Sequence, residues 1–374
     1  MRKRIAIVAN TGWYLWNFRR NLISRLMALG HDVVVISPAD AYVERLVTMG
    51  CRHIELPIDN KGSNPVRDLA TAVRIFRIYR ALRPDVTLQN TIKPNIYGTF
   101  AAAMLGIPVI NTVTGLGTAF LRPGIRLELV IWLYRLSQTR AFKVFFQNRE
   151  DLAFFREKRI IANDSGDYIP GSGVDLSRFR FSSPRDAGGD MVFLLVGRLL
   201  RDKGVVEFVQ AARLVRQQFP RVRFQLLGFL DADNASAIGE ADVRAWGREG
   251  IVEYLGATDD VVPFIQAADC VVLPSYREGL PKVLIEAAAL GTPILATDVV
   301  GCRDVVVDGV NGLLCRAADA EDLALKIRRM IELPFSERCE FARRGREMVE
   351  ARYDEELVIV KYVGAITKAV ALVE

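Results

Sequence analysis

The sequence predicts an α/β protein with two Rossmann-like domains, each built on a parallel sheet. Predicted strands and amphipathic helices alternate along the chain, which is the pattern of parallel sheets covered by helices. The 374 residues exceed the roughly 250–300 that one hydrophobic core supports. A polar, glycine-rich stretch from 170 to 189 divides the chain into two similar halves.

Short apolar runs bounded by turn residues give the predicted strands. In the first half they are Arg4–Ala9, Asp32–Ile36, Asp85–Leu88, Val109–Thr112 and Lys143–Phe146. In the second half they are Val192–Val196, Arg223–Leu227, Ile251–Leu255, Cys270–Leu273 and Ile294–Thr297. Ligands of such sheets bind beyond the carboxyl ends of the strands, so we expect the site in the cleft between the halves.

The composition predicts a large enzyme without a membrane span. Apolar residues make up 51% of the chain, yet no apolar run approaches the roughly 20 residues that a spanning helix needs. The apolar stretch 5–9 after the basic first residues is too short for a signal peptide and is interpreted as the first buried strand.

The cysteines predict neither a disulfide framework nor a zinc site. They are odd in number and scattered, without a C-x-x-C pair, at Cys51, Cys270, Cys302, Cys315 and Cys339. We therefore expect a reducing cytoplasm.

Positive charge is concentrated in the first half. Residues 1–180 hold 26 Lys and Arg against 14 Asp and Glu, whereas the remainder is net negative. This asymmetry indicates that the N-terminal domain meets something anionic, either a phospholipid surface or a phosphate-bearing acceptor. Nucleic acid is not expected, because no nucleic-acid motif is present and the arginines of 67–83 spread around their helix.

Two glutamates mark a loop-to-helix junction in the second half. Glu278 and Glu286 lie in the segment 275–286, between a buried strand and an apolar helix that ends before Gly291. A helix N-terminus attracts phosphate, and each carboxylate can accept hydrogen bonds from two hydroxyls. The segment therefore suits a ligand that carries both phosphates and a sugar.

A second loop, 197–204, supplies cations. Arg198 and Lys203 follow the strand Val192–Val196 and precede a helix that starts near Val205. Arginine offers a planar fork of donors and lysine a compact charge, which are two usual ways to hold a diphosphate.

Together the two loops resemble glycosyltransferase family 4, whose members have the GT-B fold of two Rossmann-like domains. The resemblance covers the second half, including 254–256 and 308–312, and more loosely the first. It implies a retaining hexosyltransferase with an acceptor-binding domain (1–170), a nucleotide-sugar-binding domain (171–352) and a last helix (353–374) that returns to the first domain.

The resemblance also implies roles for individual residues. Arg198, Lys203 and Glu278 would form the catalytic group, in which the two cations hold the diphosphate and Glu278 binds the transferred sugar. Glu286 would bind the ribose. The remaining donor-binding residues would be Gly12, Tyr254, Gly279, Leu280, Val283 and Leu284. Pro281 is a departure from the expected phosphate-binding loop. Proline has no backbone N–H to donate, so contacts to phosphate would have to come from neighbouring residues.

The segments 88–98 and 114–117 are most similar to those of bacterial transferases that add an N-acetylhexosamine to undecaprenyl-diphosphate-linked sugars. That similarity implies that Lys93 contacts phosphate and that Thr114 and Gly115 line the acceptor side. His31 and His53 sit beside predicted strands and are interpreted as structural.

Retention is the mechanism that the family implies, because the departing diphosphate can accept the proton of the attacking hydroxyl and no histidine is placed as a base.

Two motifs are interpreted as coincidental. Asp231-Ala232-Asp233 copies a metal-binding D-x-D, although the family needs no metal. Gly115-Leu116-Gly117 lacks the third glycine of a dinucleotide fingerprint.

The predicted function is transfer of an N-acetylhexosamine from a UDP-sugar to a polyprenyl-diphosphate saccharide, by a protein bound peripherally to the cytoplasmic face of the inner membrane through its basic first domain. The alternatives are a GDP-mannose-dependent mannosyltransferase, a nucleotide-dependent oxidoreductase or epimerase, and a non-catalytic sugar-nucleotide-binding protein. The segment 122–146 and the aromatic residues at 13, 14 and 16 fit either a lipid-facing patch or core packing. The oligomeric state is not predicted.

Overall fold

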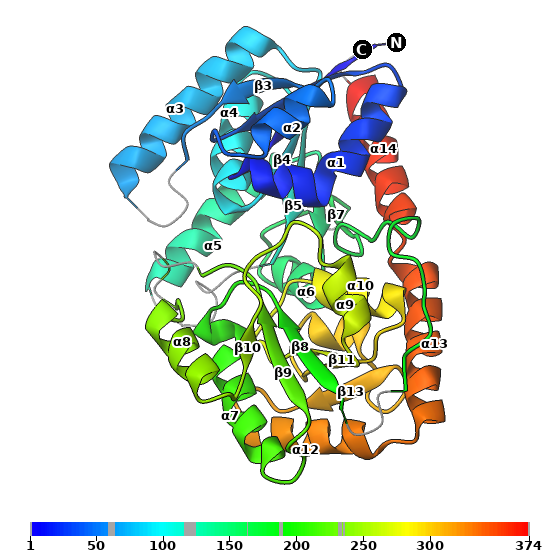
Figure 1. Ribbon diagram of the computed structural model, residues 1–374. Helices are drawn as coiled ribbons and strands as arrows, with labels where there is room; N and C mark the ends of the chain where they lie inside the picture. The colour runs from blue at the N-terminus through cyan, green and yellow to red at the C-terminus, as the bar shows by residue number, and fades with distance from the viewer. Residues whose placement is uncertain are drawn as a thin grey trace. The chain divides into compact units, whose positions relative to one another are not determined.

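The computed structural model describes residues 2–58, 64–115, 125–162, 164–186, 190–230, 234 and 236–372. The chain forms two compact units (Figure 1). The first combines Met1–Ser172 with Glu356–Glu374, and the second is Gly173–Glu355. The sequence analysis placed these divisions after residues 170 and 352.

The first unit is built on a parallel sheet that has seven strands in the described part of the chain, in the order β3-β2-β1-β4-β5-β6-β7. Its strands are β1 (Arg4–Val8), β2 (Asp32–Ser37), β3 (Arg52–Glu55), β4 (Val86–Asn90), β5 (Val109–Val113), β6 (Lys143–Phe146) and β7 (Gly166–Tyr168). Its helices are α1 (Gly12–Ala28), α2 (Val43–Thr48), α3 (Pro65–Leu82), α4 (Thr99–Met104), α5 (Ile125–Gln138), α6 (Arg149–Glu157) and α14 (Glu355–Ala371), with a π-helical turn η1 (Pro94–Gly98) before α4.

Alternating side chains of β1 enter two different cores. Ile5 and Ile7 pack with α1 and α14, whereas Ala6 and Val8 pack with α3 and α4. This is the period-two alternation of a strand covered on both faces, and it explains why β1 has no polar side chain after Arg4.

The last helix belongs to the first unit. Seven residues of α14 are buried with α1 and β1, at Val358, Ile359, Tyr362, Ala365, Ile366, Ala369 and Val370. Near its start, Glu356 forms an ion pair with Arg25 of α1 at 2.7 Å. Figure 1 shows the two helices side by side, the first in blue and the last in red.

The second unit repeats the plan with a parallel sheet of six strands among its described residues, in the order β10-β9-β8-β11-β12-β13. The strands are β8 (Val192–Val196), β9 (Arg223–Leu227), β10 (Glu253–Tyr254), β11 (Cys270–Leu273), β12 (Ile294–Thr297) and β13 (Gly312–Cys315). The helices are α7 (Val205–Arg216), α8 (Glu240–Arg248), α9 (Val262–Ala267), α10 (Lys282–Leu290), α11 (Cys302–Val305), α12 (Ala320–Glu332) and α13 (Phe335–Arg352), with a 3₁₀ turn η3 (Arg201–Lys203) before α7.

The prediction of an α/β protein with two parallel sheets is therefore confirmed. Three strands were not predicted from the sequence, and each lies at the edge of its sheet: β3, β7 and β13. Edge strands have one neighbour and need less apolar surface, so β3 (RHIE) and β7 (GDY) carry no apolar run that periodicity could detect. Within the described residues, no helix is long and apolar enough to cross a membrane.

The packing of α14 makes a testable prediction about stability. Ile366 is buried in the core shared with α1, whereas Val360 on the same helix is 58% exposed. Ile366→Ala should lower the free energy of unfolding by about 2–4 kcal/mol, because it removes buried methyl groups and leaves a cavity. Val360→Ala should change it by less than about 0.5 kcal/mol. Equal thermal unfolding midpoints for the two variants would contradict the assignment of α14 to this core.

Candidate active site

Two loops meet at the carboxyl edge of the second sheet because the strands that precede them are neighbours. β8 pairs directly with β11, so the loop after β8 (197–204) lies beside the loop after β11 (274–281). The backbone N–H of Tyr276 donates to the carbonyl of Asp202 at 2.9 Å and joins the two loops. The two motifs that the sequence singled out thus converge on one edge of one sheet.

An ion pair links the two motifs. Lys203 Nζ lies 2.5 Å from Glu278 Oε1, and the two side chains are 23% and 12% exposed. At an effective dielectric near 20 the attraction between two such charges is roughly 4 kcal/mol at 4 Å, before desolvation is subtracted. The predicted diphosphate-binding cation and the predicted sugar-binding carboxylate therefore hold each other in place.

Two glycines allow the loops to approach this closely. A Cβ on Gly204 would lie 2.1 Å from the carbonyl oxygen of Pro274, and its φ is +70°. A Cβ on Gly301, in the loop after β12, would lie 2.7 Å from the carbonyl oxygen of Glu278, at a φ of +81°. The positive φ favours glycine at both positions, and the contacts leave no room for a side chain. Gly301 carries no motif of its own and could not be identified from the sequence.

Helix α10 begins directly after the second loop. Pro281 occupies the N-cap position, and no side chain caps the helix there. Glu286, one turn into the helix, lies 3.6 Å from Lys282 Nζ and is mostly buried. Gly291, at φ +85°, ends the helix as predicted.

The structure limits how three predicted donor-binding residues could act. Leu284 is fully buried in the hydrophobic core of the second unit. Leu280 and Val283 are partly buried and pack against the same core. The N–H of Leu284 also donates to the Pro281 carbonyl at 3.1 Å, within the first turn. Any backbone contact from this helix start to a phosphate would therefore come from residues before Leu284.

Tyr254 holds neighbouring loops of the same edge together. Its hydroxyl donates to the carbonyl of Gly228 at 2.9 Å. A Cβ on Gly228 would lie 1.8 Å from the Gly197 carbonyl oxygen, so the loops after β8 and β9 also touch. Arg198, which follows Gly197, is exposed at this edge. Tyr254 thus has a structural role beside the donor-binding role predicted for it.

A partly buried polar contact beside the site could not be found from the sequence. Tyr276 donates its hydroxyl to Glu207 Oε1 at 2.7 Å, and burial, followed by the neighbouring Glu207 carboxylate, raises the pKa of Tyr276 to about 12. The tyrosine therefore stays protonated and can donate at neutral pH. It fixes the loop after β11 to the first turn of α7. Only the spacing of these residues in three dimensions reveals the pair, because 69 positions separate them.

The predicted acceptor residues lie at the carboxyl edge of the first sheet, where Lys93 follows β4 and Thr114 and Gly115 follow β5. Lys93 Nζ pairs with Asp68 Oδ1 of α3 at 2.7 Å, so its charge is offset. Leu116 and Gly117 lie outside the described residues, as do Asp231, Ala232 and Asp233. The described part of the chain holds no group of three or more His, Cys, Asp or Glu placed to bind a metal ion.

Gly12 has a local reason to be glycine. A Cβ at this position would lie 2.4 Å from Asp40 Oδ1. The same carboxylate accepts hydrogen bonds from the N–H groups of Trp13 and Tyr42 at 2.9 and 3.0 Å. At the start of α1, Asp40 therefore accepts from Trp13 and the Thr11 hydroxyl accepts from Tyr14, and the diphosphate-facing role predicted for Gly12 stays a prediction.

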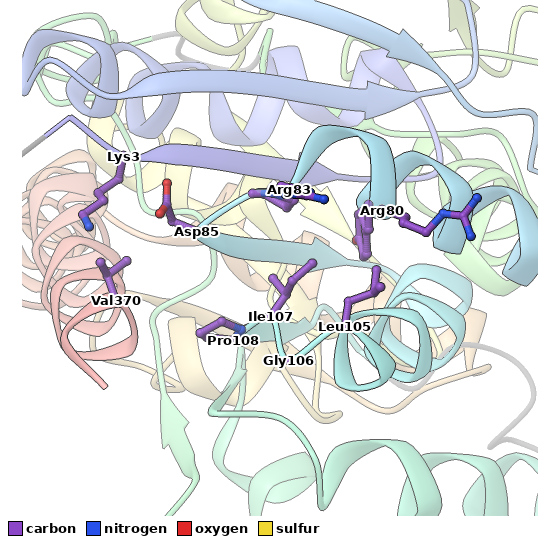
Figure 2. A pocket seen from close by; sticks show the side chains of 11 residues that line it. Lys3, Arg80, Arg83, Asp85, Leu105, Gly106, Ile107, Pro108 and Val370 are labelled. Atoms are coloured by element: carbon purple, nitrogen blue, oxygen red, sulfur yellow. The ribbon is translucent and has the colours of Figure 1, made fainter. Parts of the chain in front are cut away.

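A cavity of about 410 Å³ in the first unit is not part of either edge described above. Figure 2 shows its lining, which includes Lys3, Arg80, Arg83, Asp85 and Pro108. These residues lie at the amino ends of β1, β4 and β5 and at the end of α3. Parallel α/β sheets bind ligands at the opposite, carboxyl ends of their strands.

Two family models together match most of the chain. Residues 178–348 match the family described as glycosyl transferases group 1, and residues 15–170 match the glycosyl transferase 4-like domain. The chain therefore belongs to the glycosyltransferases, and the predicted hexosyltransferase class is confirmed.

Relatives of known activity match over much of their length. One is the N,N'-diacetylbacillosaminyl-diphospho-undecaprenol α-1,3-N-acetylgalactosaminyltransferase of Campylobacter jejuni, 28% identical over 96% of this chain and 97% of the relative. Another is the UDP-Gal:α-D-GlcNAc-diphosphoundecaprenol α-1,3-galactosyltransferase of Escherichia coli, 24% identical over 72% of this chain and 70% of the relative.

Solved structures confirm the GT-B fold. Anabaena Alr3699/HepE in complex with UDP and glucose has a TM-score of 0.80 at 19% identity, covering 98% of this chain and 100% of that one. Sucrose-phosphate synthase from Thermosynechococcus elongatus has a TM-score of 0.78 at 20% identity, with all of both chains covered.

The close loop approach predicts different costs for two glycine substitutions in the second unit. Gly204 and Gly309 have nearly the same φ, +70° and +72°, but a Cβ on Gly309 would meet nothing within 4 Å. Gly309→Ala should cost only the strain of the left-handed conformation, about 1–2 kcal/mol. Gly204→Ala should lose at least about 2 kcal/mol more, because the Pro274 carbonyl must move. Similar unfolding midpoints for both variants would disprove the constraint.

Proposed function

We propose that this protein transfers an N-acetylhexosamine from a UDP-sugar to a saccharide carried on polyprenyl diphosphate, with retention of anomeric configuration. The observation that carries the proposal is the Lys203–Glu278 pair at the carboxyl edge of the second sheet. It puts a cation suited to a diphosphate beside a carboxylate suited to sugar hydroxyls. Arg198 lies on the same edge.

The relatives support both substrates. The names of the Campylobacter jejuni and Escherichia coli enzymes specify diphospho-undecaprenol acceptors, and the first transfers N-acetylgalactosamine. The Escherichia coli enzyme uses a UDP-sugar, and the Anabaena structure contains UDP. A donor with uridine diphosphate and an acceptor on polyprenyl diphosphate are therefore the first pair to test.

In the proposed reaction, the bond between the anomeric carbon and the diphosphate oxygen breaks as the acceptor hydroxyl oxygen bonds to that carbon on the same face. The acceptor's proton passes to the departing diphosphate, so no side-chain base and no metal ion take part. The protein contributes position and charge. Arg198 and Lys203 would neutralise charge on the diphosphate, Glu278 would orient the sugar and Glu286 would bind the ribose.

The proposed location is the cytoplasmic face of the membrane, bound peripherally. The excess of basic residues in the first half of the chain supports this location. Exposed apolar side chains on two helices of the first unit support it as well. They are Val66, Leu69 and Val73 on α3 and Leu129 and Trp132 on α5. On α3 they follow one helical stripe next to arginines. On α5 the neighbouring Ile131 and Tyr134 are buried, so that helix serves the core with one face and exposes apolar side chains on another.

Thermal unfolding with a panel of nucleotides tests the donor. A ligand at about 100 times its Kd adds roughly 2.7 kcal/mol to stability. We expect UDP and certain UDP-sugars to raise the unfolding temperature, with GDP, ADP and NAD without effect. A shift with GDP alone would favour the mannosyltransferase alternative, and a shift with NAD alone would disprove sugar transfer. Radiolabelled transfer to a polyprenyl-diphosphate saccharide then tests the acceptor.

The two glutamates should separate nucleotide binding from turnover. Glu286→Ala should weaken binding of free UDP by roughly 10- to 100-fold, because it removes charge-assisted hydrogen bonds to the ribose. Glu278→Ala should lower kcat by about 100-fold or more and change UDP affinity less than Glu286→Ala does, because free UDP carries no transferred sugar and Glu278 affects the diphosphate only through its ion pair with Lys203. Calorimetry with UDP and steady-state kinetics measure these effects, with Glu332→Ala as a surface control. Equal losses of UDP affinity in both variants would contradict the division of roles.

A further inference from the structure

Arg19 of α1 is a buried guanidinium in the first unit, with only 2% of the residue exposed. Its Nε donates to Asn90 Oδ1 at 3.0 Å, and its Nη1 donates to the Phe18 carbonyl at 2.9 Å and to Ser172 Oγ at 3.1 Å. Its Nη2 is buried and has no hydrogen-bond partner among the described residues. All of these acceptors are neutral.

The rings around Arg19 do not supply a counter-charge. Tyr14 and Tyr362 each lie with their ring centre 5.4 Å from the guanidinium carbon. Burial raises the pKa of Tyr14 to about 12, so its hydroxyl keeps its proton at neutral pH. No contact found for Arg19 in the described residues is a carboxylate. A buried charge without a counter-ion is costly, so its presence needs a reason.

The position of Arg19 suggests that reason. Asn90, which it contacts, is the last residue of β4, at the carboxyl edge of the first sheet. The next residue, Thr91, has a φ of +72°, which is rare for a β-branched side chain, and its buried hydroxyl has no partner in the part of the chain that the structure describes. Backbone strain and unsatisfied polar groups gather at functional sites. Both features occur at the carboxyl ends of the strands, which is where parallel α/β sheets generally bind ligands.

The other cation expected at this edge is already paired. Lys93, two residues beyond Thr91, is held by Asp68 at 2.7 Å. Among the contacts that the described residues make with Arg19, none offsets its charge. A fixed charge in a low-dielectric interior is screened far less by salt and water than an exposed one. Its field therefore reaches an anion bound at the end of β4.

We propose that Arg19 is a positioning residue whose uncompensated charge lets the first unit recognise the diphosphate of the acceptor, at the carboxyl end of β4. The inference rests on the proposed function and deepens it. Arg19 acts from beneath the edge, through the field it creates and through Asn90, which it orients. The competing explanation is that Arg19 is only a structural link, which ties α1 to Asn90 and Ser172 and whose charge plays no part in binding.

The test compares two acceptors that carry the same saccharide, one on polyprenyl diphosphate and one on polyprenyl monophosphate. Arg19→Gln removes the charge. Asn90→Asp keeps Arg19 and places a carboxylate beside it, which neutralises the charge in place. Ser172→Ala removes one tether and leaves the charge. The readout is the ratio of kcat/KM for the diphosphate to that for the monophosphate.

We expect the ratio to fall roughly tenfold in Arg19→Gln and Asn90→Asp and to stay within about twofold of the unmodified protein in Ser172→Ala. An unchanged ratio in both charge variants, or an equal fall in Ser172→Ala, would show that Arg19 is only a tether. If Arg19→Gln does not fold, Asn90→Asp decides the question. Absence of transfer to either acceptor by the unmodified protein would instead contradict the proposed function, and this inference with it.

Discussion

The candidate active site depends on the close approach of two loops in the second unit, made possible by the pairing of β8 with β11. The carbonyl of Pro274 occupies the space where any residue but glycine at position 204 would place its Cβ. That contact brings Lys203 within 2.5 Å of Glu278. The remaining features of the edge are joined to the same place, because α10 starts directly after the second loop and the hydroxyl of Tyr254, the last residue of β10, donates to the loop after β9.

A preformed ion pair suits a transferase better than two free charges. Each side chain orients the other without a substrate, so little ordering would remain to be done when a diphosphate binds as proposed. Lys203 can then interact with a phosphate on one side and Glu278 on the other, which leaves the carboxylate with an acceptor atom for a sugar hydroxyl. Electrostatic preorganisation of this kind is the main contribution that the proposed mechanism asks of the protein.

The sequence was informative where a local pattern has a single structural solution. Strand, loop and helix could be assigned around Arg198 and Glu278 because buried strands, glycines and an apolar helix follow one another within a few residues. It was uninformative where partners are distant in the chain. The bond between Tyr276 and Glu207 and the contact of Gly12 with Asp40 depend on tertiary packing, and the short polar edge strands β3 and β7 have no apolar periodicity.

The two units treat buried charge in opposite ways. In the second unit, Lys203 and Glu278 offset each other, and the pair can accommodate a ligand that brings both negative charge and hydroxyls. In the first unit, the partners found for Arg19 among the described residues are neutral, which is the basis for the positive field proposed at the sheet edge. A field of that kind does not distinguish one sugar from another, but it does distinguish a carrier with two phosphates from a carrier with one. Specificity for the lipid carrier and specificity for the donor would then be set by separate units, through different physical means.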